Sequence, residues 1–248
     1  MKYIREFENH AAYEAAQSGL ILPNVSLCVN ENEVHYNPYV DPYAGHDYIE
    51  IGGLKWATMN IGANSVTETG LYFQWGDTQG YTAEQVGSGE GKKYFGWADY
   101  KYGNGTSSPT DTGMTKYNAT DGLATLEAVD DAAVANWGGS WRMPTTAEFQ
   151  ALGSAVNTAW TADYQGTSVA GLVCTDKTDS SKTLFFPAAG SCVNGSVYSV
   201  GNDGLYWSSS LYTYDRQNAC RLNFVSNNAN WNSLNNRFFG FAVRPVVG

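Results

Sequence analysis

The positions of the histidines set the first limit on the chemistry of this chain. They are His10, His35 and His46, so the sequence from residue 47 onward contains none. A Ser-His-Asp triad and a Cys-His dyad need an imidazole as the base, and histidine-based zinc sites need it as a ligand. The long C-terminal part of the chain therefore excludes all three arrangements.

The cysteines form no metal motif. Cys28, Cys174, Cys192 and Cys220 make no CxxC pair and no zinc-like spacing. The first residues, MKYIREFENHAAYEAA, lack the apolar core of a signal peptide, so we expect the protein to be made and folded in a cytoplasm, where thiols stay reduced. We predict free thiols, with a Cys174–Cys192 disulfide as the alternative.

Two further stretches could carry chemistry. GSGEGKK at 87–93 lacks the GxxxxGK[ST] spacing and the strand-to-helix context of a phosphate-binding loop, so we interpret it as a plain loop. Asp130 and Asp131 lie on a predicted helix and are expected to be solvated. Glycosidase-type carboxylates from distant loops would leave no local signature, and Asp/Asn-rich loops could hold calcium, so both alternatives stay open. We predict no enzyme activity, no metal and no cofactor.

Composition limits the partners. The chain has 248 residues and a net charge of −10, and no stretch concentrates Lys or Arg, which argues against nucleic acid and anionic membranes. No apolar run is long enough to span a membrane, so no membrane insertion is expected. The hydrophobic fraction of 43% is enough for a sizeable core. Abundant Gly, Tyr and Trp suit a loop-rich fold with aromatic packing better than a helical bundle.

The end of the chain, NNANWNSLNNRFFGFAVRPVVG, is unusual in crowding asparagines against large apolar residues. Asparagine is a poor strand and helix former, because its side chain competes for backbone hydrogen bonds. Apolar and polar residues do not alternate regularly here, until an ordinary-looking strand at 242–247. Folding alone does not account for this composition.

The elements that would position these residues fall into two parts. Residues 1–46 are predicted to form an N-terminal attachment or oligomerisation segment, with a short helix at 7–19, a hairpin around residues 30–32 and a linker at 38–45. Residues 47–248 are predicted to form one domain. It begins with two strands joined by Gly52-Gly53, followed by further β pattern in TGLYFQWGD and a long loop region at 76–122.

Two helices are predicted in the middle of this domain. One spans 125–137, with Leu126, Val129, Ala133 and Trp137 at helical spacing, and the other spans 145–156, with a capping box formed by Thr145 and Glu148. The rest is strand and turn in VAGLVCT, TLFFPAAG, VYSVG, GLYWSSSL, CRLNFV and FAVRPV. Strands, then helices, then more strands indicate an α+β fold with mostly antiparallel pairing.

Six stretches occur in an order that resembles a known domain type. They are GLKWATMNIGA (53–63), GLYFQWGDT (70–78), WGGSWRMPTTAEFQAL (137–152), LFFPAAGSCVNG (184–195), GLYWSSS (204–210) and FAVRPV (241–246). Together they resemble the Fibrobacter succinogenes major-paralogue (FISUMP) domains of gut Bacteroidetes, a branch of the C-type-lectin-like fold near the formylglycine-generating-enzyme type. The resemblance covers roughly residues 48–248 and implies a C-type-lectin-like ligand-binding domain.

Residues 205–246 further resemble the variable region of a diversity-generating retroelement target protein. In that family a reverse transcriptase copies a template repeat inaccurately at adenines, so that template AAC and AAT codons become many residues, but not Gln, Trp, Lys or Met. Trp231 and Gln217 are then fixed or come from other codons. The asparagines at 227–236 would then be encoded by template codons that were copied without mutation.

This resemblance implies a hypervariable surface over a constant scaffold. Leu222 and Phe224 alternate with Arg221, Asn223 and Val225, which predicts one buried and one variable strand face. The expected scaffold residues are Trp207, Ala219, Leu222, Phe224, Arg237, Gly240, Val243, Arg244 and Pro245. The expected ligand-binding residues are Tyr212, Tyr214, Arg216, Asn218, Arg221, Asn223, Val225, Asn227, Asn228, Asn230, Trp231, Asn232, Ser233, Leu234, Asn235, Asn236, Phe238, Phe239 and Phe241.

The N-terminal segment resembles those of Bacteroides phage and prophage proteins. This implies a virion component, a receptor-binding tail tip that recognises a host-surface protein or glycan. Its N-terminal segment would attach to a tail or fibre protein, with a homotrimer as one arrangement.

Three alternatives remain. An oxidase of the formylglycine-generating type would need a reactive cysteine pair, but Cys192 and Cys220 lie in no matching motif. A calcium-dependent lectin would carry Glu-Pro-Asn or Trp-Asn-Asp, and neither occurs. A structural lectin-like module of a surface or virion fibre is the main alternative.

Overall fold

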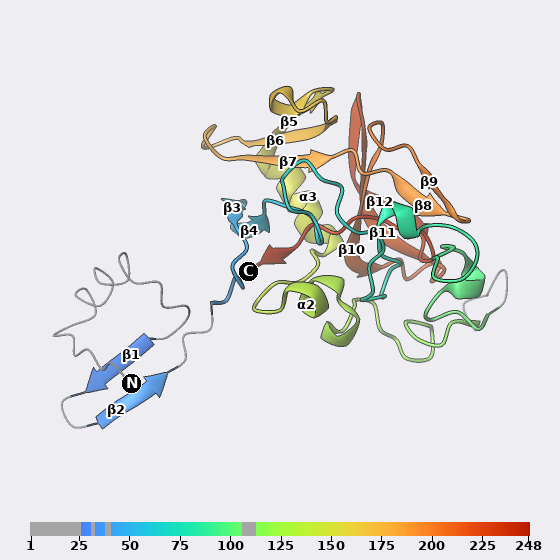
Figure 1. The fold of residues 1–248 in the computed structure, drawn as a ribbon, viewed down its shortest axis with the longest axis horizontal. Coiled ribbons are helices and arrows are strands. Elements are labelled where there is room, and N and C mark those ends of the chain that lie inside the picture. The colour runs from blue at the N-terminus through green and yellow to red at the C-terminus, as the bar shows by residue number, and fades with distance from the viewer. Residues whose placement is uncertain (1–25, 31–32, 38–40, 106–112) are drawn as a thin grey trace.

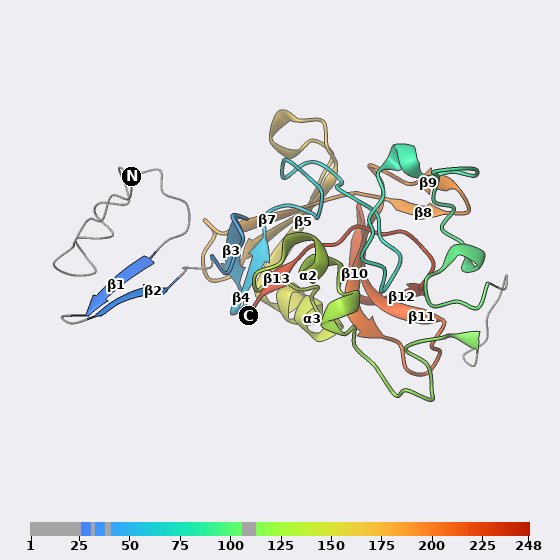
Figure 2. The same ribbon diagram turned by 60° about the horizontal axis from the view of Figure 1, so that its bottom comes forward.

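The structure is a computed structural model that describes residues 26–30, 33–37, 41–105 and 113–248. Strands β1 (Ser26–Asn30) and β2 (Glu33–Asn37) pair antiparallel, which confirms the predicted hairpin. It lies apart from the other elements in both ribbon views (Figures 1 and 2). The predicted helix at 7–19 lies outside the described residues. Within the described part, no helix is long and apolar enough to cross a membrane.

The domain is α+β with antiparallel sheets, as the sequence predicted (Figure 1). One sheet has the order β10-β11-β12, from Gly204–Leu211, Asn218–Val225 and Asn228–Asn236. A second has the order β13-β4-β3, from Val246–Val247, Leu54–Ala57 and Tyr48–Ile51. A third has the order β5-β6-β7, from Val156–Thr161, Gly171–Asp176 and Thr183–Pro187. β8 (Ser191–Val193) and β9 (Ser196–Tyr198) form a hairpin.

Local signals explain the elements that were predicted correctly. Helix α3 (Thr146–Ala155) begins at the N-cap Thr145, whose side chain accepts from the N–H of Glu148 while the carboxylate of Glu148 accepts from the N–H of Thr145. β3 and β4 meet at Gly52 and Gly53, where φ of +62° and +80° favours glycine. The capping box and the glycine turn therefore fix these boundaries.

The predicted helix at 125–137 is wrong in its first half. Residues Ala128–Asp130 form a short 3-10 turn, and helix α2 covers only Ala132–Trp137. The carboxylate of Asp131 accepts from the N–H groups of Ala133 and Val134, so it caps a new helix instead of continuing an old one. Val129, placed on the apolar face by the prediction, is 74% exposed.

Two strand predictions need correction, and two strands were not predicted. TGLYFQWGD contributes only the isolated bridges Tyr72–Tyr81 and Phe73–Phe241, and FAVRPV forms isolated bridges followed by the two residues of β13. Conversely, β5 follows α3 directly and was not predicted. Neither was β12, which runs through the asparagine-rich segment and pairs with β11. Pairing with a neighbour overrides the weak strand preference of asparagine here.

The two largest hydrophobic clusters hold the sheets and helices together. In the first, Phe149 and Leu152 of α3 pack with residues of β3, β4 and β5–β7 and with Leu222 and Phe224 of β11. In the second, α2 and the 71–75 segment pack around Trp75 and Trp207. The β10-β11-β12 sheet contributes to both clusters, with Tyr206 and Leu222 in the first and Leu205 and Trp207 in the second, so core side chains cover part of each face.

The predicted linker at 38–45 packs on the domain along its described part. The N–H of Ser140 donates to the carbonyl of Pro42 at 2.8 Å, and the indole N–H of Trp141 donates to the carbonyl of Tyr43 at 2.7 Å. The ring of His46 stacks on Trp137, with centroids 3.6 Å apart. Burial lowers the pKa of His46. Residues from Asp41 onward are therefore structurally part of the domain.

Candidate binding surface

Strand β11 carries the expected alternation. Leu222 and Phe224 are fully buried, whereas Arg221, Asn223 and Val225 are half-buried on the opposite face. Their neighbours Tyr206 on β10 and Ala229 on β12 pack into the same cluster as Leu222 and Phe224. One face of the strand thus belongs to the core, and the prediction of a two-faced strand is confirmed.

The register of β11 and β12 places several expected site residues side by side. Cross-strand partners in an antiparallel pair share a face, so each pair presents two neighbouring side chains. The register shifts between Arg221 and Asn223, because β12 has an extra residue there. The pairs on the face opposite Leu222 and Phe224 are Val225–Asn228, Asn223–Asn230, Arg221–Ser233 and Ala219–Asn235.

Arg221 is the most constrained residue of this face. Its guanidinium lies over the ring of Phe241 at 5.4 Å, and its Nε donates to the carbonyl of Leu234 at 3.2 Å. Burial lowers the pKa of Arg221 to about 10. Its Nη1 is buried and has no hydrogen-bond partner among the described residues. Arg221 is therefore held by the sheet, and its polar end is incompletely satisfied.

The extra residue turns the middle of β12 toward α3. The half-buried Trp231 packs against the first hydrophobic cluster, and its indole lies directly over Gly153 of α3. Asn232 is exposed, and its Oδ1 accepts from the hydroxyl of Thr146 at 3.2 Å. Leu234 is half-buried opposite Cys220. Trp231 is thus an anchor of the strand as well as a surface residue.

The connection from β10 to β11 holds a second group of expected site residues. Tyr214 is 90% exposed, and its ring lies 5.6 Å from that of Tyr212. Arg216 is half-buried and its Nη1 donates to the carbonyl of Leu123 at 3.0 Å, while Nδ2 of Asn218 donates to Asp215 at 2.8 Å. This group lies at the opposite end of β11 from the 226–227 turn.

The three phenylalanines after β12 differ in accessibility. Phe241 is fully buried, with its ring tilted against that of Trp207 and the centroids 4.3 Å apart, so its expected place on the contact surface is wrong. Phe238 is half-buried against Trp97 at 4.8 Å, and the half-buried Phe239 packs on the second cluster. A large side chain following an irregular segment gives no sequence signal that distinguishes a core from a surface position.

The asparagines of β12 range from exposed to half-buried. Asn227 and Asn228 are exposed at the tip, Asn230 and Asn232 are exposed along the strand, and Asn235 and Asn236 are half-buried at its end. The expected site residues therefore run as a strip along β11 and β12. An eight-residue strand is about 27 Å long, so this strip is longer than a single small-molecule site.

All nine expected scaffold residues are buried. Arg237 is fully buried, with its guanidinium 5.5 Å from the ring of Trp75 and its Nη1 donating to the carbonyl of Tyr117 at 3.2 Å. Arg244 is also fully buried and donates to Asn60 and to the carbonyls of Ala57 and Thr58. These arginines tie the backbone of distant segments to the C-terminal residues.

Asp130 and Asp131 are 3% and 4% exposed, so the prediction that they are solvated is wrong. Asp130 accepts from Lys101 at 3.1 Å, from Lys116 at 2.5 Å and from the hydroxyls of Tyr102 and Tyr117. Burial alone would raise the pKa of Asp130, but these hydrogen bonds together hold it well below its usual range. The network joins Lys101, Tyr102, Lys116 and Tyr117 to the residue that precedes the N-cap of α2.

The described cysteines are free and inert. Cys174, Cys192 and Cys220 form no disulfide, so the alternative Cys174–Cys192 bridge is wrong. Burial raises the pKa of the Cys174 and Cys192 thiols to about 12, which keeps both as neutral thiols near pH 7. Over the described ranges, no three His, Cys, Asp or Glu side chains cluster as metal ligands would.

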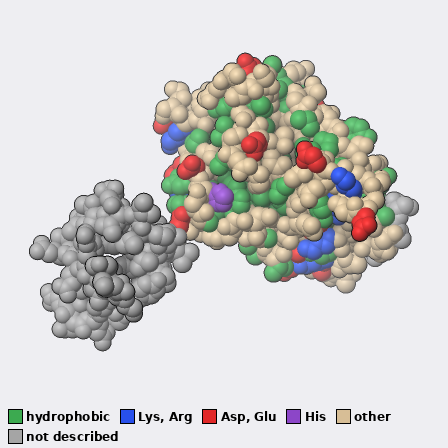
Figure 3. Space-filling view, in the orientation of Figure 1, with side chains coloured by type: hydrophobic (Ala, Val, Ile, Leu, Met, Phe, Trp, Pro, Cys, Tyr) green, Lys and Arg blue, Asp and Glu red, His purple; other side chains and the backbone are tan. Residues whose placement is uncertain are grey.

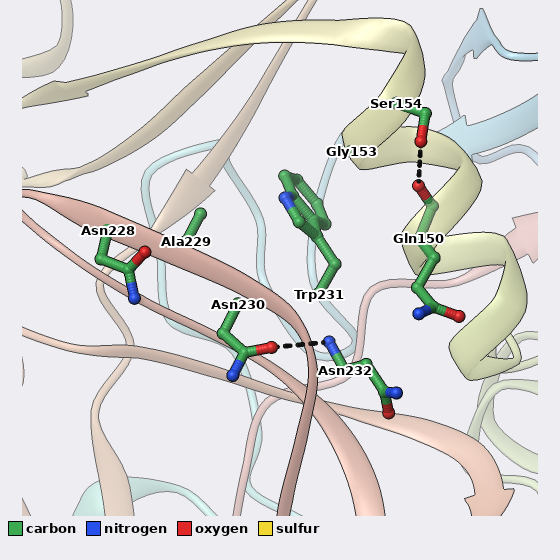
Figure 4. A pocket seen from close by; sticks show the side chains of 8 residues that line it. All are labelled: Gln150, Gly153, Ser154, Asn228, Ala229, Asn230, Trp231 and Asn232. Carbon is green, nitrogen blue, oxygen red and sulfur yellow. Dashed lines mark hydrogen bonds between the residues drawn. The ribbon is translucent and has the colours of Figure 1, made fainter.

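Two grooves border the tip of the β11–β12 pair. The larger has a volume of about 500 Å³ and lies between β12 and α3, where Gln150, Gly153 and Ser154 face residues 228–232 (Figure 4). The smaller has a volume of about 310 Å³ and lies between the tip and β5 and β6, with Trp160 in its wall. Both are lined by Asn228, Ala229 and Trp231. On the face shown in Figure 3, acidic and basic side chains lie scattered in small groups.

Comparison of the chain with known proteins gives no match to a family model, to a curated protein or to a solved structure. The α+β architecture with mostly antiparallel sheets follows from the structure itself.

Proposed function

We propose that this chain is a diversified ligand-binding protein whose domain has a C-type-lectin-like fold. Its contact surface is the strip formed by β11, β12 and the β10–β11 connection. The observation that carries this proposal is the alternation on β11, where Leu222 and Phe224 are core while Arg221, Asn223 and Val225 lie half-buried on the opposite face. Such a strand can vary the residues on one face while the core residues on the other face stay constant.

The chemistry of the strip supports the same proposal. Tyrosine, asparagine and serine combine rigid aromatic area with adaptable hydrogen bonding, as the contact loops of antibodies do. Tyr214 is 90% exposed and Tyr212 lies beside it, while Asn223 pairs across the strands with Asn230. All nine residues assigned to the scaffold are buried, so the strip rests on a surface that need not change.

We further propose that the protein is the receptor-binding tip of a phage tail. In this arrangement the segment before Asp41 attaches to a tail or fibre protein, and the strip recognises a host-surface protein or glycan. The resemblance of the sequence to retroelement variable proteins supports this role. The placement of the β1–β2 hairpin, apart from the domain, suits an attachment element.

DNA sequencing tests the diversification directly. We expect a near-copy of codons 205–246 close to the gene, beside a reverse transcriptase, that differs from the gene only where the copy has adenines. Differences scattered over all four bases, or no copy, would refute diversification. The chain would then be a structural lectin-like module with ordinary asparagine-rich strands.

Binding to cells tests the surface. We expect the triple variant Tyr214→Ala, Asn223→Ala, Asn230→Ala to lose binding to a responsive strain from a panel of gut Bacteroidetes. Its Tm should stay within about 2 °C of the parent, because Tyr214 and Asn230 are exposed and Asn223 is only half-buried. Retained binding, or a large loss of stability, would contradict the proposed surface.

The matched control removes the same residue types elsewhere. Tyr198, Asn157 and Asn202 are exposed and lie outside the strip and both grooves. The variant Tyr198→Ala, Asn157→Ala, Asn202→Ala should bind cells as the parent does. Equal loss in both variants would show that the effect is not local to the strip.

A further inference from the structure

We propose that the groove between α3 and β12 binds a neutral oligosaccharide. This inference rests on the proposed function, because it names the ligand class for one part of the same strip. The groove volume of about 500 Å³ lies in the range of small-molecule sites, and its mouth is open to solvent. Figure 4 shows Trp231 between Ala229 of β12 and Gly153 of α3, with Gln150 on the helix side.

The lining of the groove selects for a ligand without charge. It contains the amides of Gln150, Asn228, Asn230 and Asn232 and the hydroxyl of Ser154, and no ionisable side chain. A carboxylate or phosphate placed here would give up water without a cation in the lining to offset the loss, in a protein whose net charge is −10. The ammonium of Lys177, which is not a lining residue, already donates to the carbonyl of Ser154 at 2.7 Å. Sugar hydroxyls both donate and accept, and side-chain amides offer the matching acceptors and donors.

Two of these amides are already oriented by the protein. Oδ1 of Asn230 accepts from the backbone N–H of Asn232 at 3.0 Å, and Oδ1 of Asn232 accepts from the hydroxyl of Thr146 at 3.2 Å. Each oxygen is thus fixed, and each Nδ2 is left to donate. In contrast, the side-chain amides of Gln150 and Asn228 make no hydrogen bond to any described residue. The oriented donors reduce the entropy lost when a ligand binds, and the unengaged amides keep their full hydrogen-bonding capacity for the ligand.

Trp231 gives the groove its apolar wall. One face of the indole is covered by the backbone of Gly153, so the ring cannot turn toward the helix. The same ring borders the smaller groove, which also contains Trp160. An indole offers an apolar surface for the C–H face of a sugar ring beside a polar N–H. Because the two grooves meet at Trp231, the site has room for linked sugars, not only one.

The test uses three neutral disaccharides, maltose, cellobiose and lactose, with sialyllactose as the charged probe. Saturation-transfer NMR on the full chain at about 10 mM sugar detects binding in the millimolar range. We expect at least one neutral disaccharide to bind and sialyllactose to bind no better. We expect Gln150→Ala with Asn228→Ala to raise its Kd about tenfold, because both unengaged amides are lost.

The control variant is Gln79→Ala with Asn157→Ala. It removes the same two residue types from exposed positions outside both grooves and should leave Kd unchanged within about twofold. Absence of binding by all three neutral disaccharides overturns the inference. So does stronger binding of sialyllactose, or an equal effect of both variants.

Cell binding after periodate or protease treatment distinguishes failure of this inference from failure of the proposed function. Periodate cleaves vicinal diols of surface sugars, and a protease removes surface proteins. Cell binding that survives periodate but not protease would overturn the sugar inference and leave the receptor-binding proposal standing. No cell binding by the untreated parent, over the whole strain panel, would count against the proposed function itself.

Discussion

Replacing Gly153 by alanine should reveal whether Trp231 is an anchor of β12. A Cβ built on Gly153 would stand 2.6 Å from Nε1 and 2.7 Å from Cδ1 and Cδ2 of the indole, whereas ordinary contact begins at 3.4 Å. Helix α3 cannot shift freely, because Phe149 and Leu152 are buried in the first hydrophobic cluster. The clash should therefore fall on Trp231.

Two opposing effects set the size of the change. Overpacking costs typically about 1–3 kcal/mol, whereas alanine is favoured over glycine in a helix by about 1 kcal/mol. We expect Gly153→Ala to destabilise the parent by about 1 kcal/mol. In a Trp231→Ala background the clash is absent, so Gly153→Ala should stabilise by about 1 kcal/mol, a coupling of about 2 kcal/mol.

The assay is urea unfolding of the parent, both single variants and the double variant. Ala151→Gly is the control, because Ala151 is exposed on the same helix and its loss should cost about 1 kcal/mol in both backgrounds. A Gly153→Ala effect of the same sign and size with and without Trp231 would refute the reasoning. Trp231 would then be a mobile surface side chain, and the apolar wall of the groove would not be fixed.

Three further predictions concern the network, the sheet and the thiols. Asp130→Asn should destabilise the protein by about 3 kcal/mol, because it leaves Lys101 and Lys116 without their buried anion. The pKa of Asp130 is depressed in the folded protein, so its stabilising effect is present above the unfolded pKa of about 3.9 and is lost as the pH falls below that value. Between pH 4 and pH 2 the free energy of unfolding should therefore fall less steeply in the variant than in the parent. A variant as acid-sensitive as the parent would contradict this. Leu222→Ala should cost about 3 kcal/mol and Asn223→Ala less than about 0.5 kcal/mol in urea unfolding; similar losses would show that β11 has no outward face. In a Cys28→Ser variant the three remaining thiols should not react with Ellman's reagent until the protein unfolds, and rapid reaction of the folded protein would refute their burial.

Sequence reasoning found the elements whose signals are local. The capping box of Thr145 and Glu148, the Gly52-Gly53 turn and the period-two pattern of β11 each act within a few residues, and each was predicted. Strand β12 was missed because its regular alternation is interrupted where the register with β11 shifts. That shift is visible only when the partner strand is known.

The buried charges were missed for a related reason. The partners of Asp130 are Lys101, Tyr102, Lys116 and Tyr117, which are 13 to 29 residues away in the sequence. Adjacent aspartates on a helical pattern normally indicate a solvated face, and no local feature revealed this network. Likewise, Phe241 could be assigned to the core only once its contact with Trp207 was seen.

Among the described strands, β12 pairs with β11 alone, so it forms an edge of its sheet. An edge strand exposes backbone donors and acceptors that can recruit a strand of another molecule. Under the proposed diversification, this edge would be rewritten repeatedly, and some versions would carry runs of Val, Leu or Phe that favour cross-β assembly. Asparagine, the extra residue in β12 and the adjacent helix α3 all weaken that tendency. Solubility would then limit which β12 sequences are tolerated as firmly as folding does. The asparagine-rich sequence encoded by the unmutated template would be the one least prone to self-association.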